Sequence, residues 1–249
     1  MIRLIACDID GTLLLPGQTS IAPVIFEEIR RLNKKGVRFC PNSGRRPESL
    51  RRLFAPVAER LYYICENGAS VFRPDGALLG KTPIARDTAL YLAHRILALP
   101  GSEVMISGIG GCYLCPKSGE VVEVVQALGN DIVLVRTPED IKEDILKVSA
   151  LCPEADRLAP QLEDCPLPPQ IAGPRWVDFT LADKATGLRQ LGGLLGIAPE
   201  EMLAIGDNYN DVGMLEFAGN AWLMASAAPE LLSRFPQHCR RVEEVLQSL

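Results

Sequence analysis

The 249-residue sequence lacks the features of nucleic-acid-binding and membrane proteins. Its Lys and Arg residues occur in runs no longer than pairs, and the formal net charge is -5. Because phosphate backbones bind to concentrated basic patches, we expect no nucleic-acid partner. No stretch approaches the ~20 apolar residues of a membrane-spanning helix, and the apolar start at residues 2–7 is too short for a signal peptide. We therefore expect a cytoplasmic protein with no membrane partner.

Cysteine is too sparse for a disulfide scaffold, because the chain has eight cysteines in 249 residues. Cys112 and Cys115, with Cys152 and Cys165 downstream, have the chemistry to bind zinc, but the absence of a second closely spaced pair argues against such a site. Three other thiols lie in apolar runs and are interpreted as core residues: Cys7, Cys40 and Cys65. The sequence contains neither a P-loop motif nor a complete dinucleotide fingerprint.

The composition of 47% hydrophobic and 23% charged residues is typical of a compact globular protein. A short apolar run at residues 2–7 predicts a buried strand, and apolar residues recur at helical spacing over 21–32. Further strands are predicted at 37–41 and 61–66. Alternation of strands and helices is typical of a parallel sheet with right-handed crossovers. We therefore expect an α/β fold with a Rossmann-like parallel sheet core.

The pattern changes after residue 82 and returns to strand–helix alternation with a predicted strand at 176–181. Between residue 82 and this strand, the sequence predicts a helix, two paired short strands and a proline-rich stretch. Together these elements indicate an inserted α+β lobe. We expect a discontinuous core domain at residues 1–82 and 178–249, interrupted by an inserted domain at 83–177.

Two carboxylates, Asp8 and Asp10, stand where the first predicted strand ends. On an extended backbone residues i and i+2 point to the same side, so both can face one site. A nucleophile and a proton shuttle need such a placement. The alternative is an Asp-x-Asp-Gly turn without a chemical role.

A second pair of acids, Asp207 and Asp211, follows the strand predicted at residues 202–205. Mg²⁺ prefers oxygen ligands, and one or two carboxylates together with a substrate phosphate are enough to bind it. Carboxylates at two strand ends therefore predict one magnesium site. An Asp that only caps the following helix is the alternative, and both roles are compatible.

Ser43, Gly44 and Arg45 follow the second predicted strand and offer a hydroxyl, a backbone amide and a helix N-terminus to an anion. Lys184 lies where the chain returns to the core, and a lysine is a point charge suited to phosphate. Each signal is weak singly, because Ser-Gly is an ordinary turn and most lysines are solvated. Together they indicate a phosphoryl site.

Four segments occur in the order found in the haloacid dehalogenase superfamily, and the chain resembles its Cof-type phosphatases, which carry a large (type IIB) cap domain. The specific segments are Asp-Ile-Asp-Gly-Thr-Leu at residues 8–13 and Gly-Asp-Asn-Tyr-Asn-Asp at 206–211. Ser43 and Lys184 are the other two. Ser43 stands where the family more often has Thr, which keeps the hydroxyl.

The resemblance implies that Asp8 attacks phosphorus and forms an aspartyl phosphate. It also implies that Asp10 protonates the leaving oxygen and later activates water. Mg²⁺ would then bind Asp8, the main-chain carbonyl of Asp10 and Asp207, with Asp211 in support.

By the same resemblance, Ser43, Lys184, Asn210 and the backbone amide of Gly44 hold the phosphoryl oxygens. Arg45 is a further expected phosphate contact, as is Asn67, which opens an Asn-Gly-Ala segment common in the capped members.

The sequence therefore predicts a phosphatase acting on a small phosphorylated metabolite such as a sugar phosphate. A phosphosugar mutase is an alternative, because Asp10 is expected in both enzymes. A non-catalytic phospho-acceptor is a third, although no member of the expected catalytic set is missing. The oligomeric state is not indicated by the sequence.

Overall fold

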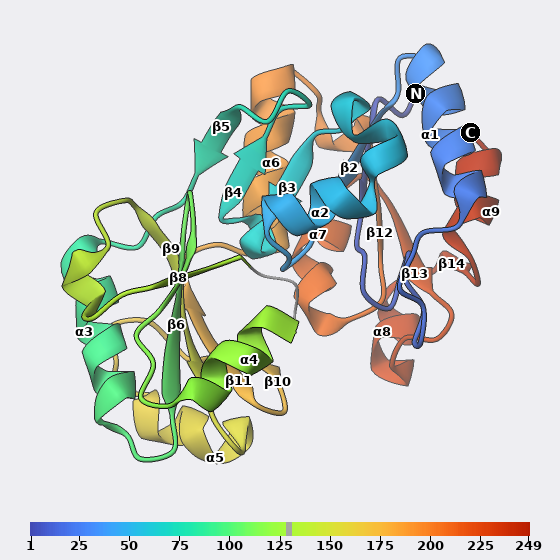
Figure 1. Cartoon of the computed structure of the whole chain (residues 1–249). Coiled ribbons are helices and arrows are strands. Elements are labelled where there is room, and N and C mark those ends of the chain that lie inside the picture. Colours follow the sequence, from blue (N-terminus) through green and yellow to red (C-terminus); the bar gives the residue numbers. More distant parts are fainter. Residues whose placement is uncertain (128–130) are drawn as a thin grey trace. The chain divides into compact units, whose positions relative to one another are not determined.

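The computed structural model describes residues 1–127 and 131–249, which form two compact units (Figure 1). The core unit comprises Met1–Lys81 and Ala182–Leu249, and the inserted unit comprises Thr82–Leu181. The predicted α/β class is confirmed. None of the helices in the described residues combines the length and the apolar character that crossing a membrane requires.

The core unit is built on a five-stranded sheet in which every neighbouring pair is parallel. Its strands in spatial order are β14 (His238–Cys239), β13 (Asn220–Met224), β12 (Met202–Gly206), β1 (Leu4–Cys7) and β2 (Arg38–Pro41). β1 lies between β2 and β12, so the ends of three strands that are distant in sequence meet at one edge.

Helices cover both faces of this sheet, which explains why β1 reads as a continuous apolar run. Ile5 and Cys7 face one apolar cluster, whereas Leu4 and Ala6 face the other. The helices packed on the first face are α1 (Pro23–Lys34), α2 (Pro47–Leu53) and α9 (Val242–Gln247). Those on the second face are α6 (Lys184–Leu195), α7 (Val212–Phe217) and α8 (Pro229–Arg234).

A small antiparallel sheet adjoins β2 through a bridge between Asn42 and Ile64. Its strands are β3 (Tyr63–Cys65), β4 (Ser70–Phe72) and β5 (Leu78–Lys81). Two short 3₁₀ segments matter for the site, namely Glu66–Gly68 after β3 and Tyr209–Asp211 after β12. Other 3₁₀ segments span Ala55–Arg60, Pro138–Asp140, Ala159–Leu162 and Pro199–Glu201.

The inserted unit contains a six-stranded sheet within its described residues, antiparallel except where β7 pairs with β8. In spatial order the strands are β10 (Gln170–Gly173), β11 (Trp176–Thr180), β9 (Ile145–Leu151), β6 (Glu103–Gly108), β7 (Cys112–Leu114) and β8 (Ile132–Leu134). The helices α3 (Arg86–Ala98) and α5 (Ala155–Leu158) pack on one face, and α4 (Gly119–Ala127) packs on the other.

Strand β11 differs from the expectation that it resumes the parallel core. It pairs antiparallel with β9 and β10, and Val177 and Phe179 pack into the apolar cluster of the inserted unit. The inserted unit therefore ends at Leu181 rather than at residue 177. Alternating side chains identify a strand, but they do not specify the sheet that it joins.

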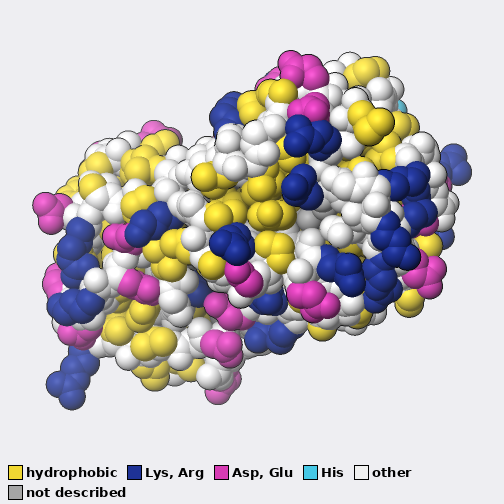
Figure 2. All heavy atoms as spheres, turned by 90° about the horizontal axis from the view of Figure 1, so that it is seen from above, with side chains coloured by type: hydrophobic (Ala, Val, Ile, Leu, Met, Phe, Trp, Pro, Cys, Tyr) yellow, Lys and Arg dark blue, Asp and Glu magenta, His cyan; other side chains and the backbone are white. Residues whose placement is uncertain are grey.

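The cysteines suggested as zinc ligands do not converge. Cys112 packs in the cluster beneath α4, whereas Cys115, Cys152 and Cys165 belong to the cluster on the opposite face of the sheet. The four thiols consequently do not form one metal site. On the molecular face drawn in Figure 2, Lys and Arg side chains form several groups with Asp, Glu and hydrophobic side chains between them.

Candidate active site

The carboxyl ends of β1, β2 and β12 bring most of the predicted site residues together. Cys7 pairs with both Pro41 and Ile205, so the residues that follow these three strands emerge side by side. Asp8 follows β1, Ser43 lies just beyond β2, and Asp207 follows β12. Ligands of parallel sheets bind beyond the carboxyl ends of the strands, so this edge is the candidate active site.

A buried lysine joins two of the predicted carboxylates. The Nζ atom of Lys184 donates to Asp8 Oδ1 and to Asp211 Oδ1, at 2.5 Å in each case. Lys184 begins α6, where the N-cap Asp183 accepts the backbone N–H of Thr186 at 2.7 Å and thus sets the start of the helix. The Lys184 side chain is 1% exposed and that of Asp8 is 7% exposed. This ion pair is therefore shielded from water and salt.

Burial and neighbouring charges shift the pKa values of these groups. Burial raises the pKa of Asp8 to about 7, although Lys184 acts to lower it. Burial also raises the pKa of Asp207. It would lower the pKa of Lys184, but the charges of Asp8 and Asp211 outweigh burial and raise that pKa. A divalent cation beside the carboxylates would stabilise their ionised forms.

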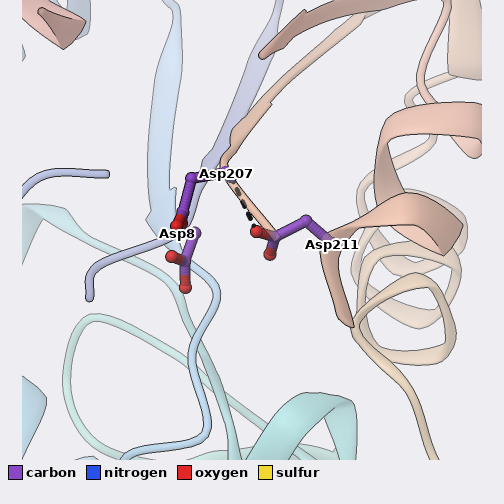
Figure 3. A group of neighbouring side chains, drawn as sticks. All are labelled: Asp8, Asp207 and Asp211. Carbon is purple, nitrogen blue, oxygen red and sulfur yellow. Dashed lines mark hydrogen bonds between the residues drawn. The ribbon is translucent and has the colours of Figure 1, made fainter. Parts of the chain in front are cut away.

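Asp211 uses both carboxylate oxygens to hold its neighbours. Oδ1 binds Lys184, and Oδ2 accepts the backbone N–H groups of Asp207 and Asn208 at 2.9 and 3.0 Å. Figure 3 shows Asp8, Asp207 and Asp211 together, with the bond from Asp207 to Asp211 dashed. The fully buried Asp211 therefore orients the loop that presents Asp207.

Thr12 is a site residue to which the sequence analysis assigned no role. Its Oγ1 donates to Asp207 Oδ1 at 2.9 Å across 195 positions of sequence. Gly11 lies equally close, since a Cβ added there would be 2.2 Å from Asp207 Oδ2. Both residues belong to the Asp-x-Asp-Gly-Thr segment, so this motif could have indicated that they belong to the site. The Thr12 hydroxyl therefore orients the Asp207 carboxylate, and the missing side chain of Gly11 leaves room for it.

Asp10 and Arg45 pair with each other. Arg45 donates from Nε to Asp10 Oδ2 at 2.8 Å and from Nη2 to Oδ1 at 2.6 Å. The Asp10 side chain is 57% exposed, in contrast to that of Asp8. The structure thus gives Arg45 a carboxylate partner, whereas the sequence predicts that it contacts phosphate.

The turn after β2 is held by its neighbours. Ser43 is buried, and its Oγ accepts the backbone N–H of Arg45 at 3.2 Å. The amide of Asn67 lies against Gly44, because a Cβ on Gly44 would be 3.1 Å from Asn67 Oδ1. Asn42, which precedes Ser43, donates from Nδ2 to the main-chain oxygen of Lys184 at 2.9 Å.

Asn210 is the least constrained of the predicted phosphate contacts. It is exposed and lies in the 3₁₀ segment Tyr209–Asp211, between the two acids of the second cluster. Its position at the same strand end leaves its side chain accessible to a ligand.

The oxygen-rich donor set fits a hard divalent cation. Asp8, Asp207 and Asp211 each offer a carboxylate oxygen, and these atoms lie within 4.8 Å of one another. Both oxygens of Asp211 already accept hydrogen bonds, so Asp8 and Asp207 are the better placed direct ligands. Carboxylate oxygens with room for water and a phosphate are the environment that Mg²⁺ prefers.

Comparison with known proteins agrees with this geometry. The family model described as haloacid dehalogenase-like hydrolase matches residues 5–244. The 5-amino-6-(5-phospho-D-ribitylamino)uracil phosphatase YbjI of Escherichia coli (strain K12) is 27% identical over 93% of this chain and 88% of its own length.

Solved structures match over nearly the whole chain as well. One from Eubacterium rectale has a TM-score of 0.89 at 28% identity and covers 99% of this chain and 98% of that one. The subclass IIB sugar phosphatase BT4131 superposes with a TM-score of 0.81 at 20% identity, covering 99% of this chain and 97% of its own. The chain belongs to the haloacid dehalogenase-like hydrolase family.

Proposed function

We propose that this protein is a magnesium-dependent phosphatase that cleaves a small phosphorylated metabolite through an aspartyl phosphate on Asp8. The observation that carries the proposal is the buried contact of Asp8 with Lys184, next to Asp207. A carboxylate that is hydrogen-bonded to a buried lysine, at the carboxyl ends of parallel strands, is suited to attack on a phosphoryl group.

In the first step an oxygen of Asp8 bonds to phosphorus as the bond to the leaving oxygen breaks. Asp10 acts as the general acid and gives a proton to that oxygen. In the second step water bonds to phosphorus and the bond to Asp8 breaks, while Asp10 takes a proton from the water. Asp10 is exposed enough to meet both the leaving group and water.

Other residues of this chain balance the phosphoryl charge. Lys184 supplies a buried positive charge, and Ser43, Gly44 and Asn210 position the oxygens. Mg²⁺, when held by Asp8, Asp207 and the main-chain carbonyl of Asp10, would supply further charge neutralisation. Asp211 supports the site by holding Lys184 and the Asp207 backbone.

The proposed substrate is a phosphomonoester of a sugar or sugar-like alcohol. The E. coli relative is named for a substrate with a phosphorylated ribityl chain, and one structural neighbour is named a sugar phosphatase. Both support a small, hydroxyl-bearing leaving group.

The test is phosphate release from a panel of sugar phosphates with Mg²⁺ and with a chelator. Asp8→Asn should lower kcat at least about a thousandfold, because it removes the nucleophile. Asp75→Asn, which changes an exposed turn residue of the same unit, is the matched control. Wild-type turnover by Asp8→Asn would refute the proposal. Transfer of the phosphoryl group to a sugar hydroxyl instead of water would indicate a mutase.

A further inference from the structure

The loop after β3 has an unusual backbone. Glu66, Asn67 and Gly68 have consecutive φ angles of 51°, 53° and 95°. Glu66 and Asn67 are the non-glycine residues with positive φ in the described parts of the chain. This left-handed conformation is costly for residues with a Cβ, and it persists where the surrounding structure requires it.

One side of this loop is bonded to the predicted phosphoryl-binding turn. The backbone N–H of Asn67 donates to Ser43 O at 3.0 Å, and that of Glu66 donates to Arg45 O at 3.2 Å. In return, the N–H of Ser43 donates to Ile64 O at 3.0 Å. The bond from Asn67 requires the left-handed φ of Glu66, because an extended backbone at Glu66 would direct the N–H of Asn67 away from Ser43.

The other side of the loop packs on the helix that carries Lys184. A Cβ added at Gly68 would lie 1.8 Å from the carbonyl oxygen of Asp183, the residue that caps α6. A Cβ added at Gly187 would lie 2.9 Å from the Cα of Gly68. The two backbones are therefore in direct contact, and the loop fills the space between the Ser43 turn and the first turn of α6.

We infer that the left-handed loop Glu66–Gly68 positions the phosphoryl site by setting the separation of Ser43 from Lys184. Asn67 is then a positioning residue that acts through its backbone, rather than the phosphate ligand that the sequence suggested. This inference rests on the proposed function, because it concerns the same phosphoryl group. The physical reason for the strained backbone is that it holds two catalytic segments from separate parts of the chain.

The first test compares Gly68→Ala with Gly76→Ala. The two glycines have φ angles of +95° and +88°, but a Cβ at Gly76 meets only Arg51 Nη1, at 3.9 Å. Both variants bear the cost of positive φ, whereas Gly68→Ala also displaces the start of α6. We expect kcat to fall about a hundredfold in Gly68→Ala, as for a displacement of about 1 Å, and to stay near wild type in Gly76→Ala.

A second pair of variants, Asn67→Gly and Asn67→Ala, tests the inference if Gly68→Ala does not fold. Glycine adopts the left-handed conformation readily, whereas alanine does not, and both lack the amide of Asn67. We expect Asn67→Gly to be at least about ten times as active as Asn67→Ala. Equal activity of these two variants would overturn the inference. If both were impaired, the side-chain amide would be the functional group, and if both matched wild type, the left-handed backbone at Asn67 would not matter. Wild-type kcat in a folded Gly68→Ala would overturn it as well.

Binding of inorganic phosphate separates this inference from the proposed function. Phosphate with Mg²⁺ should raise the Tm of the wild-type protein and of Gly76→Ala, with a smaller rise or none in Gly68→Ala. That pattern without turnover of any substrate would refute the phosphatase proposal and support the positioning role. Equal phosphate-induced shifts in folded Gly68→Ala and in wild type would refute the positioning role.

Discussion

Replacing Lys184 with methionine tests the central ion pair. Methionine retains an unbranched apolar stem but removes the charge that lies 2.5 Å from both Asp8 and Asp211. Removing one partner of a buried ion pair costs about 3–5 kcal/mol, because the remaining charge is left uncompensated. At about 2–4 °C per kcal/mol for a protein of this size, we expect the Tm of Lys184→Met to fall by roughly 6–20 °C.

The loss of stability expected for Lys184→Met depends on pH. The pKa of Asp8 is raised to about 7 in the folded protein, from an ordinary value of 3.8. Between these values the folded protein binds more protons than the unfolded chain, so stability falls as pH rises. Without Lys184 the carboxylates have no compensating charge, so the pKa of Asp8 should rise further and the fall in stability should extend to higher pH. The difference between wild type and variant should be largest above pH 7 and should shrink as Asp8 becomes protonated.

The assay is thermal and urea unfolding across this pH range, with a chelator present so that no cation replaces the lysine. Lys34→Met, at an exposed position of α1, is the control for the loss of a lysine. A pH-independent difference below about 1 kcal/mol between Lys184→Met and wild type would refute the reasoning, since exposed ion pairs contribute that little.

Three further outcomes follow from the site. Thr12→Val removes the hydrogen bond to Asp207 and should raise the Mg²⁺ concentration for half-maximal activity about 10–100-fold, with Thr88→Val, in α3 of the inserted unit, as the control in a magnesium titration. Arg45→Met removes the two hydrogen bonds that orient the Asp10 carboxylate and should lower kcat at least about tenfold with little change in phosphate affinity; unaltered kcat would contradict this orienting role. Asp8→Asn should destabilise the chelator-treated protein above pH 7 less than Lys184→Met does, because Asp211 still pairs with Lys184 and burial raises the pKa of the carboxyl that is lost; an equal loss in urea unfolding would count against this reasoning.

Much of the core was predictable because local patterns reflect local physics. Apolar runs ending in Asp8 and Asp207 predict buried parallel strands, and parallel strands end at a common edge. The family assignment follows from the same segments and is confirmed by the match over residues 5–244. Strand β11 was assigned to the wrong sheet because Val177 and Phe179 indicate a strand without indicating its partner.

The sequence by itself determined which residue types stand at the strand ends, since strand and helix periodicity depends on neighbouring residues. Only the tertiary structure decided which of these side chains pair: Lys184 with Asp8 across 176 positions, Thr12 with Asp207 across 195, and Arg45 with Asp10. Such pairs depend on the packing of segments that are distant in sequence, and no local preference encodes their distances or burial.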